Sequence, residues 1–128
     1  MTAPTLFWCG RWGTELAQRV NAENFDKLVL QVTQPVLVDF YSDTCVPCKV
    51  MSCVLGELEE EYAGELQIYK VNINYEEKLT EQCAVMAVPT IILFRSGKEV
   101  GRTKGAVPKK ALIQMLHMDV QAKQTEGK

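Results

Sequence analysis

The sequence predicts an α/β fold in which a central mixed β-sheet is flanked by helices on both faces. The runs at 36–41 and 88–94 are apolar and rich in β-branched residues, and 66–73 alternates between apolar and polar residues. Stretches with apolar residues three or four positions apart lie between these runs and are typical of amphipathic helices. Alternating strands and helices favour a sheet covered by helices.

The length and composition of the chain favour a single domain. Of its 128 residues, 47% are hydrophobic and 23% are charged, which is enough for one core of its own. We place this domain at 21–120, between an N-terminal extension at 1–20 and a polar C-terminal tail at 121–128. The extension either packs on the domain's own surface or covers or recruits something there. Its aromatic residues are Phe7, Trp8 and Trp12.

The first part of the domain is predicted to be a helix followed by a buried strand. Asn21 is expected to cap a helix that extends to Val32, and Pro35 requires that helix to end before it. The inner face of this helix consists of Phe25, Leu28, Val29 and Val32. The strand at 36–41 is apolar except for Asp39.

A pair of cysteines begins the next helix. Cys45 and Cys48 follow a short polar turn after the strand, and the helix is predicted to run from about 46 to 63 and to stop at Gly64. The later elements are a strand at 66–73, a short helix at 75–83, a strand at 88–94, a hairpin turn at 95–98, a strand at 99–104 and a helix from Pro108. The inner face of that last helix consists of Leu112, Ile113, Leu116 and Val120.

A strand that delivers Cys-x-x-Cys to the start of a helix predicts thiol–disulfide chemistry. The reactive species is the thiolate, and the helix dipole favours it at Cys45, which should therefore be the exposed nucleophile. Cys48, one turn inside the helix, should resolve the mixed disulfide. Pro47 is tolerated in the first helical turn and stiffens the loop.

Asp39 is predicted to take part in this chemistry as a proton acceptor. A carboxyl group in a covered strand is costly when charged, so the pKa of Asp39 should rise, and such a group can take the proton of Cys48. Lys70, on a neighbouring strand, is a possible partner of Asp39. On the residues alone, however, Lys70 is interpreted as a surface lysine with a snorkelling stem.

Four motifs fall in the order and spacing of one known family: Val38-Asp39-Phe40, Cys45-Val46-Pro47-Cys48-Lys49, Ala87-Val88-Pro89-Thr90 and Lys104-Gly105-Ala106. With them the chain resembles thioredoxins over roughly residues 22–118 and is expected to have the thioredoxin fold. The resemblance implies that Cys45 attacks and Cys48 resolves. It also implies that Asp39 is the buried acid and Lys70 its lysine neighbour, and that Pro89 is in the cis form.

The same resemblance implies a protein-disulfide reductase with no bound cofactor, whose redox group is the Cys45–Cys48 disulfide. Its partners would be disulfide-containing client proteins and an electron-donating reductase similar to thioredoxin reductase. The surface that receives a client is expected to include Val46, Pro47, Val88, Pro89 and Gly105. The backbone of Val88 would pair with an extended client segment, and Gly105 would leave room for it.

Several residues depart from the usual family pattern. Thr44 stands where tryptophan is usual, and Val46 replaces a glycine beside the nucleophile. Tyr41 replaces a common tryptophan, Cys53 a helix-kinking proline and Ala87 a frequent glycine. These changes bear on redox potential and choice of partner more than on fold.

Composition and charge argue against several other functions. The net charge is −2 and no basic patch suggests nucleic acid. No apolar run approaches the roughly 20 residues of a membrane helix, and the N-terminus lacks the features of a secretory signal. Five cysteines are not typical of a secreted disulfide framework. We therefore expect a cytoplasmic monomer.

A metal site is the first alternative reading of the cysteine pair. A structural zinc ion needs four ligands, and Cys45 and Cys48 supply two. Cys53 lies about 140° round the helix from Cys48, at roughly 100° per residue, so it does not converge on them. His117 is expected on the surface of the last helix. No metal is therefore predicted.

Two further alternatives keep the fold but change the function. Thr44 and Val46 are compatible with an adaptor or binding module that has little or no turnover. An oxidase or isomerase would use the same cysteines in the opposite direction. Cys53 and Cys83 are interpreted as buried apolar residues, although a second, regulatory disulfide involving them or Cys9 is a competing hypothesis.

Overall fold

The structure, a computed structural model, describes residues 18–126, and the side chains up to His117. In chain order its elements are β1 (Gln18–Arg19), the π-helix η2 (Asp26–Leu30), β2 (Val36–Tyr41), α2 (Val46–Glu61), β3 (Gln67–Asn72), α3 (Glu77–Gln82), β4 (Thr90–Arg95), β5 (Lys98–Lys104) and α4 (Lys109–Glu126). The predicted roles for Phe7, Trp8, Cys9 and Trp12 lie outside the described residues.

Within residues 18–126, five strands form one sheet in the order β1-β3-β2-β4-β5. β1, β3 and β2 are parallel, whereas β4 runs antiparallel to both β2 and β5. This confirms the predicted mixed sheet. β2 lies at its centre and all six of its residues are buried, which explains its nearly continuous apolar sequence.

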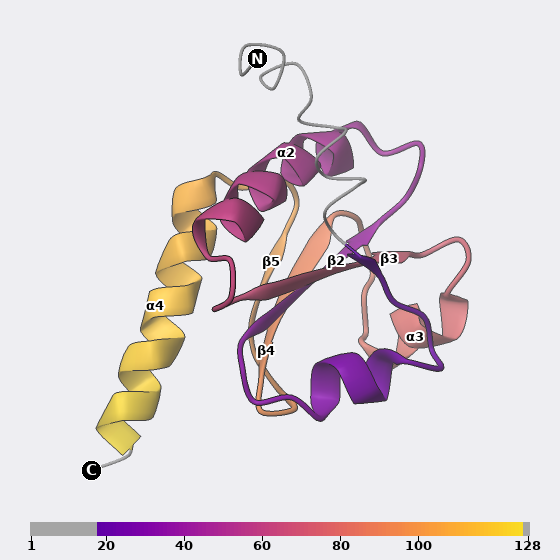
Figure 1. Ribbon diagram of the computed structural model, residues 1–128. Helices are drawn as coiled ribbons and strands as arrows, with labels where there is room; N and C mark the ends of the chain where they lie inside the picture. Colours follow the sequence, from indigo (N-terminus) through magenta and orange to yellow (C-terminus); the bar gives the residue numbers. More distant parts are fainter. Residues whose placement is uncertain (1–17, 127–128) are drawn as a thin grey trace.

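Helices cover both faces of the sheet, as predicted, and Figure 1 shows the two layers. α2 and α4 pack on one face, where Leu37 of β2 and Ile68 of β3 join their apolar side chains in one cluster. The other face meets η2 and α3 in a second cluster, which includes Val38 and Phe40. Because side chains alternate along a strand, Asp39 points to the same face as Leu37, beneath α2.

The N-terminal part of the domain differs from its prediction. β1 was not predicted, because it is two exposed polar residues with no apolar pattern, and pairing with Tyr69 and Lys70 of β3 creates it. The first helix is shorter than predicted. Asn21 still accepts a hydrogen bond from the backbone N–H of Asn24 at 2.9 Å, as a capping residue does.

The strand predicted at 88–94 begins only at Thr90, directly after Pro89. Lys109 begins the last helix, directly after Pro108. Across residues 18–126, no helix combines the length and apolar character needed to span a membrane.

Candidate active site

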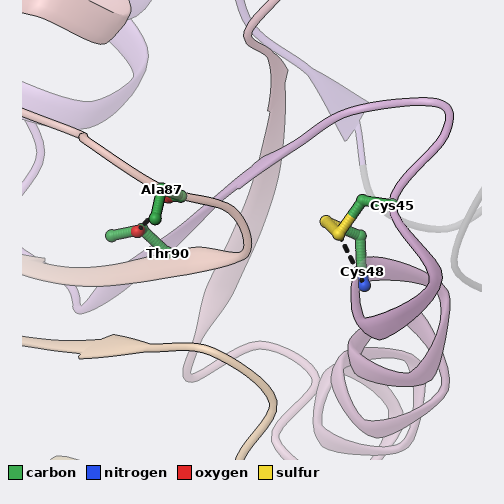
Figure 2. The surroundings of a disulfide bond; sticks show 4 residues. All are labelled: Cys45, Cys48, Ala87 and Thr90. Atoms are coloured by element: carbon green, nitrogen blue, oxygen red, sulfur yellow. Dashed lines mark hydrogen bonds between the residues drawn. A yellow bond between two sulfur atoms is a disulfide. The ribbon is translucent and has the colours of Figure 1, made fainter.

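The cysteine pair lies where β2 gives way to α2. Cys45 is the N-cap residue of α2, and its Sγ accepts a hydrogen bond from the backbone N–H of Cys48 at 3.1 Å. The two residues form a disulfide, and their Cα atoms are 5.2 Å apart (Figure 2). Pro47 is in the first turn of the helix, where its missing N–H leaves no hydrogen bond unmade. The positions predicted for these three residues are confirmed.

The two sulfur-bearing residues differ in exposure. Cys48 is 2% exposed, whereas Cys45 is only half-buried at the end of the helix. The flanking Val46 is 69% exposed, and Pro47 is exposed as well. A protein disulfide that approaches from solvent therefore meets Cys45 first.

Asp39 is fully buried, as the sequence predicted for a carboxyl group in a covered strand. It is 0% exposed, and neither carboxylate oxygen has a hydrogen-bond partner among the described residues. Burial raises the pKa of Asp39 to about 7, and the nearby Lys70 ammonium opposes this rise. Asp39 is thus a carboxyl group that can gain and lose a proton near neutral pH.

Lys70 is buried, so its interpretation as a surface lysine is wrong. It is 5% exposed, because β3 is covered on both faces at this point. Strand register places Lys70 directly beside Asp39, and its Nζ lies 4.6 Å from the centre of the Tyr41 ring. Burial lowers the pKa of Lys70, while the charge of Asp39 acts in the opposite direction.

The segment before β4 lies at the same edge of the sheet as the cysteines. Thr90 pairs with Phe40 at the end of β2, and its hydroxyl donates to the carbonyl of Ala87 at 2.6 Å. Figure 2 shows this tight turn on the side of the site opposite the disulfide. The peptide bond between Val88 and Pro89 is cis, as the resemblance implied.

Gly105 joins this segment from the end of β5. Its backbone N–H donates to the carbonyl of Pro89 at 2.8 Å, and its φ of +81° is one that glycine adopts without strain. A Cβ atom at Gly105 would meet no protein atom within 4 Å, so the space beside it is open. Two residues later, the N–H of Val107 donates to the Met51 sulfur of α2 at 3.3 Å. The strand end, the cis-proline segment and α2 are thereby tied together.

Sequence reasoning missed three residues near this edge. Met86 is 91% exposed, and only its position just before Ala87 hinted at a role. Asp43 precedes the cysteine pair and accepts a hydrogen bond from the Asn72 side chain at 3.3 Å. Asn72 is 4% exposed at the end of β3. That contact joins positions 29 residues apart, so no local pattern could have indicated it.

Two other cysteines, Cys53 and Cys83, are among the described residues. Cys53 is half-buried on α2, and Cys83, which follows α3, is half-buried as well. Burial raises the pKa of the Cys83 thiol, and Arg102 opposes the rise. His117 is exposed on α4. Within the described part of the chain, no group of three or more His, Cys, Asp or Glu residues is arranged to hold a metal ion.

Comparisons with known proteins agree with this geometry. The thioredoxin family model matches residues 17–118. The chain is 35% identical over 100 residues to thioredoxin 1 of Nostoc sp., a match that covers 78% of this chain and 94% of the relative. It is 43% identical over 98 residues to a thioredoxin of Chlamydia caviae, with 77% and 93% covered.

Chloroplastic proteins are also among the relatives. The chain is 36% identical over 95 residues to the M-type thioredoxin of Pisum sativum, which covers 74% of this chain and 55% of that protein. The chain thus spans about half the length of this chloroplastic relative. The matched family, the mixed sheet with helices on both faces and the disulfide at the start of α2 lead to one conclusion. The chain belongs to the thioredoxin family and is a thiol–disulfide oxidoreductase of the protein-disulfide reductase type.

Proposed function

We propose that reduced Cys45 attacks the disulfides of client proteins and that Cys48 resolves the resulting mixed disulfide. The observation that supports this order most directly is the difference in exposure between half-buried Cys45 and 2%-exposed Cys48. In the reduced protein, the helix N-terminus and the Cys48 N–H favour a thiolate at Cys45.

The reaction balances as two exchanges. The Cys45 thiolate forms a bond to one client sulfur, and the other client sulfur leaves as a thiolate. Cys48 then loses its proton and attacks Cys45, which closes the Cys45–Cys48 disulfide and releases the second client thiolate. The client gains two electrons, and a reductase similar to thioredoxin reductase must return two electrons to this chain.

Asp39 accepts the proton of Cys48 in this proposal. Asp39 faces α2 from within the sheet, and its pKa of about 7 suits proton transfer at neutral pH. Lys70 lies beside Asp39, and its positive charge stabilises the deprotonated carboxylate that is ready to accept this proton. The proton therefore moves between two buried groups while the client remains at the surface.

The client occupies the edge formed by Val46, Pro47, Val88, Pro89 and Gly105. The first two are exposed beside the nucleophile, and the open space at Gly105 accommodates an extended segment that pairs with the backbone of Val88. We further propose that the protein acts as a monomer in the cytoplasm, without a bound cofactor. The net charge of −2 argues against a nucleic-acid partner.

Turnover is tested by reduction of insulin disulfides with dithiothreitol as electron donor. We expect Cys45→Ser and Cys48→Ser to abolish turnover, and Cys53→Ser, a cysteine on the same helix but away from the pair, to retain most of it. Equal loss in all three variants would contradict the proposal.

An adaptor function is the second candidate, and the exposure of Val46 and Met86 favours a surface that holds a partner. It predicts little insulin reduction by the wild-type protein, together with client binding that survives Cys45→Ser. The reductive direction is tested separately by the redox potential. A value near that of thioredoxin, about −270 mV, supports a reductase, and one near −120 mV supports an oxidase.

A further inference from the structure

Two carboxylates act on the Lys70 ammonium, and only one of them has a role in the proposed reaction. Its neighbour Asp39 comes from β2, Asp43 from the turn after β2, and Arg19 from β1. All three charges act on the Lys70 ammonium, which is 5% exposed. Asp43 is exposed, whereas Asp39 is fully buried, so the two carboxylates act on this lysine from different environments.

A fixed hydrogen-bond chain holds Asp43 in place. The buried Asn72 donates its side-chain N–H to Asp43 at 3.3 Å and accepts the backbone N–H of Asn74 at 3.0 Å. Asn72 is two residues beyond Lys70 on β3, so both side chains point to the same face of the sheet. The amide thus anchors the Asp43 carboxylate at the end of the strand that carries the lysine.

Tyr41 also contacts Lys70. The ammonium lies over the Tyr41 ring at 4.6 Å, a contact that favours the charged form. The Tyr41 hydroxyl is buried and has no hydrogen-bond partner among the described residues, so the ring and not the hydroxyl contacts the lysine. Asp39, Asp43 and Tyr41 all favour the positive charge of Lys70, which burial alone would disfavour.

We propose that Asp43, held by Asn72, is a positioning residue that keeps Lys70 charged and in place beside Asp39, and so sets the pH range in which Asp39 accepts the proton of Cys48. The proposal rests on the role given to Asp39 above. In this proposal Asp43 takes no part in the exchange itself. It acts through Lys70, whose charge lowers the pKa of Asp39.

The mechanism is tested by the direction in which Asp43→Asn shifts the midpoint of Asp39 titration. The midpoint of Asp39 titration in the reduced protein is followed by carbon-13 NMR of its carboxyl group. In Asp43→Asn, Lys70 loses a stabilising charge, so we expect the Asp39 midpoint to rise by about 0.5 pH units or more. A direct effect of the lost negative charge on Asp39 would move the midpoint down instead. A downward shift, or none, would overturn the proposal.

Two further variants isolate the path through Lys70. Asp43→Glu keeps the charge and should retain a midpoint close to that of wild type. Lys70→Met should raise the midpoint by itself, and adding Asp43→Asn to it should produce no further rise. A full rise in the Lys70→Met background would show that Asp43 acts by another route. Asp26→Asn, an exposed change on η2, is the matched control and should shift nothing.

Activity separates this proposal from the one on which it rests. Insulin reduction is measured between pH 5 and 9 for Asp39→Asn and Asp43→Asn. If Asp39→Asn leaves the pH profile unchanged, the proton-acceptor role fails and this inference fails with it. In the other case, Asp39→Asn alters the pH profile. If Asp43→Asn then changes neither the pH profile nor the midpoint of Asp39 titration, only the role of Asp43 fails.

Discussion

Burial of Asp39 without a hydrogen-bond partner affects folding as well as proton transfer. The unfolded chain releases this proton with a pKa of 3.8, whereas the folded protein releases it at about 7. Between these values the folded state binds the proton more tightly, so the stabilisation is complete below pH 3.8 and is lost as the pH rises through 7. Over the whole range this amounts to about 4 kcal/mol as an upper estimate.

Asp39→Asn should therefore remove a pH dependence of stability. Between pH 5 and pH 8 we expect the wild-type protein to lose about 3 kcal/mol of unfolding free energy relative to the variant. Urea denaturation at the two pH values measures this difference. Glu60→Gln, an exposed change on α2, should show the same change in unfolding free energy between pH 5 and pH 8 as the wild-type protein. If the wild-type protein and Asp39→Asn show the same change in unfolding free energy between the two pH values, the buried carboxyl group does not titrate in this range.

Residue chemistry was predictable where a residue's role follows from its neighbours in the chain. The two cysteines and Asp39 were found because an apolar strand precedes a helix start. The burial of Lys70 was not predictable, because a lysine within an alternating strand is usually exposed. Its ammonium is accommodated by Tyr41, which comes from another strand, and a single sequence does not reveal such pairings.

At the scale of elements, the turn between β4 and β5 joins the sheet closely to the first helix. The turn between β4 and β5 contains two residues with positive φ, Ser96 at 53° and Gly97 at 81°. A Cβ atom on Gly97 would lie 2.6 Å from the carbonyl oxygen of Leu30, at the end of η2. The turn of the hairpin therefore packs closely against the end of the first helix.

Gly97→Ala should destabilise the protein by roughly 2–4 kcal/mol, because left-handed backbone strain adds to a clash with the main chain. Gly64 is the matched control, since it also has positive φ, at 86°, but a Cβ there meets nothing within 4 Å. Gly64→Ala should cost only about 1 kcal/mol. Urea denaturation of the two variants measures the difference, and equal losses would rule out a clash at Leu30.

The elements that the sequence predicted best are those with a strong pattern of their own. β2 and β4 are apolar and β-branched, and α2 has both a Pro near its start and a repeating apolar face. β1 and η2 depend instead on tertiary contacts. β1 exists because β3 offers a free edge, and only Phe25 and Val29 of the first helix region are buried.

For the whole molecule, the central mixed sheet brings three separate segments to one edge. Parallel β2 and β3 end there, and antiparallel β4 begins there. The cysteine turn follows β2, the cis-proline segment precedes β4 and Gly105 follows β5, so all three lie at this edge of the sheet. The alternation of strands and helices was sufficient to predict the mixed sheet covered by helices, whereas the place of Pro89 and Gly105 in the site followed only from the resemblance to thioredoxins. The contact between Asp43 and Asn72 required the folded structure.

The central claim is that Cys45 attacks a client and Cys48 resolves the product, and trapping the mixed disulfide tests it most directly. Reduced Cys48→Ser and Cys45→Ser proteins are each mixed with excess insulin and analysed by non-reducing mass spectrometry. The account predicts a stable adduct through Cys45 in Cys48→Ser and little or none in Cys45→Ser. An adduct that forms equally well through Cys48 in Cys45→Ser would contradict it.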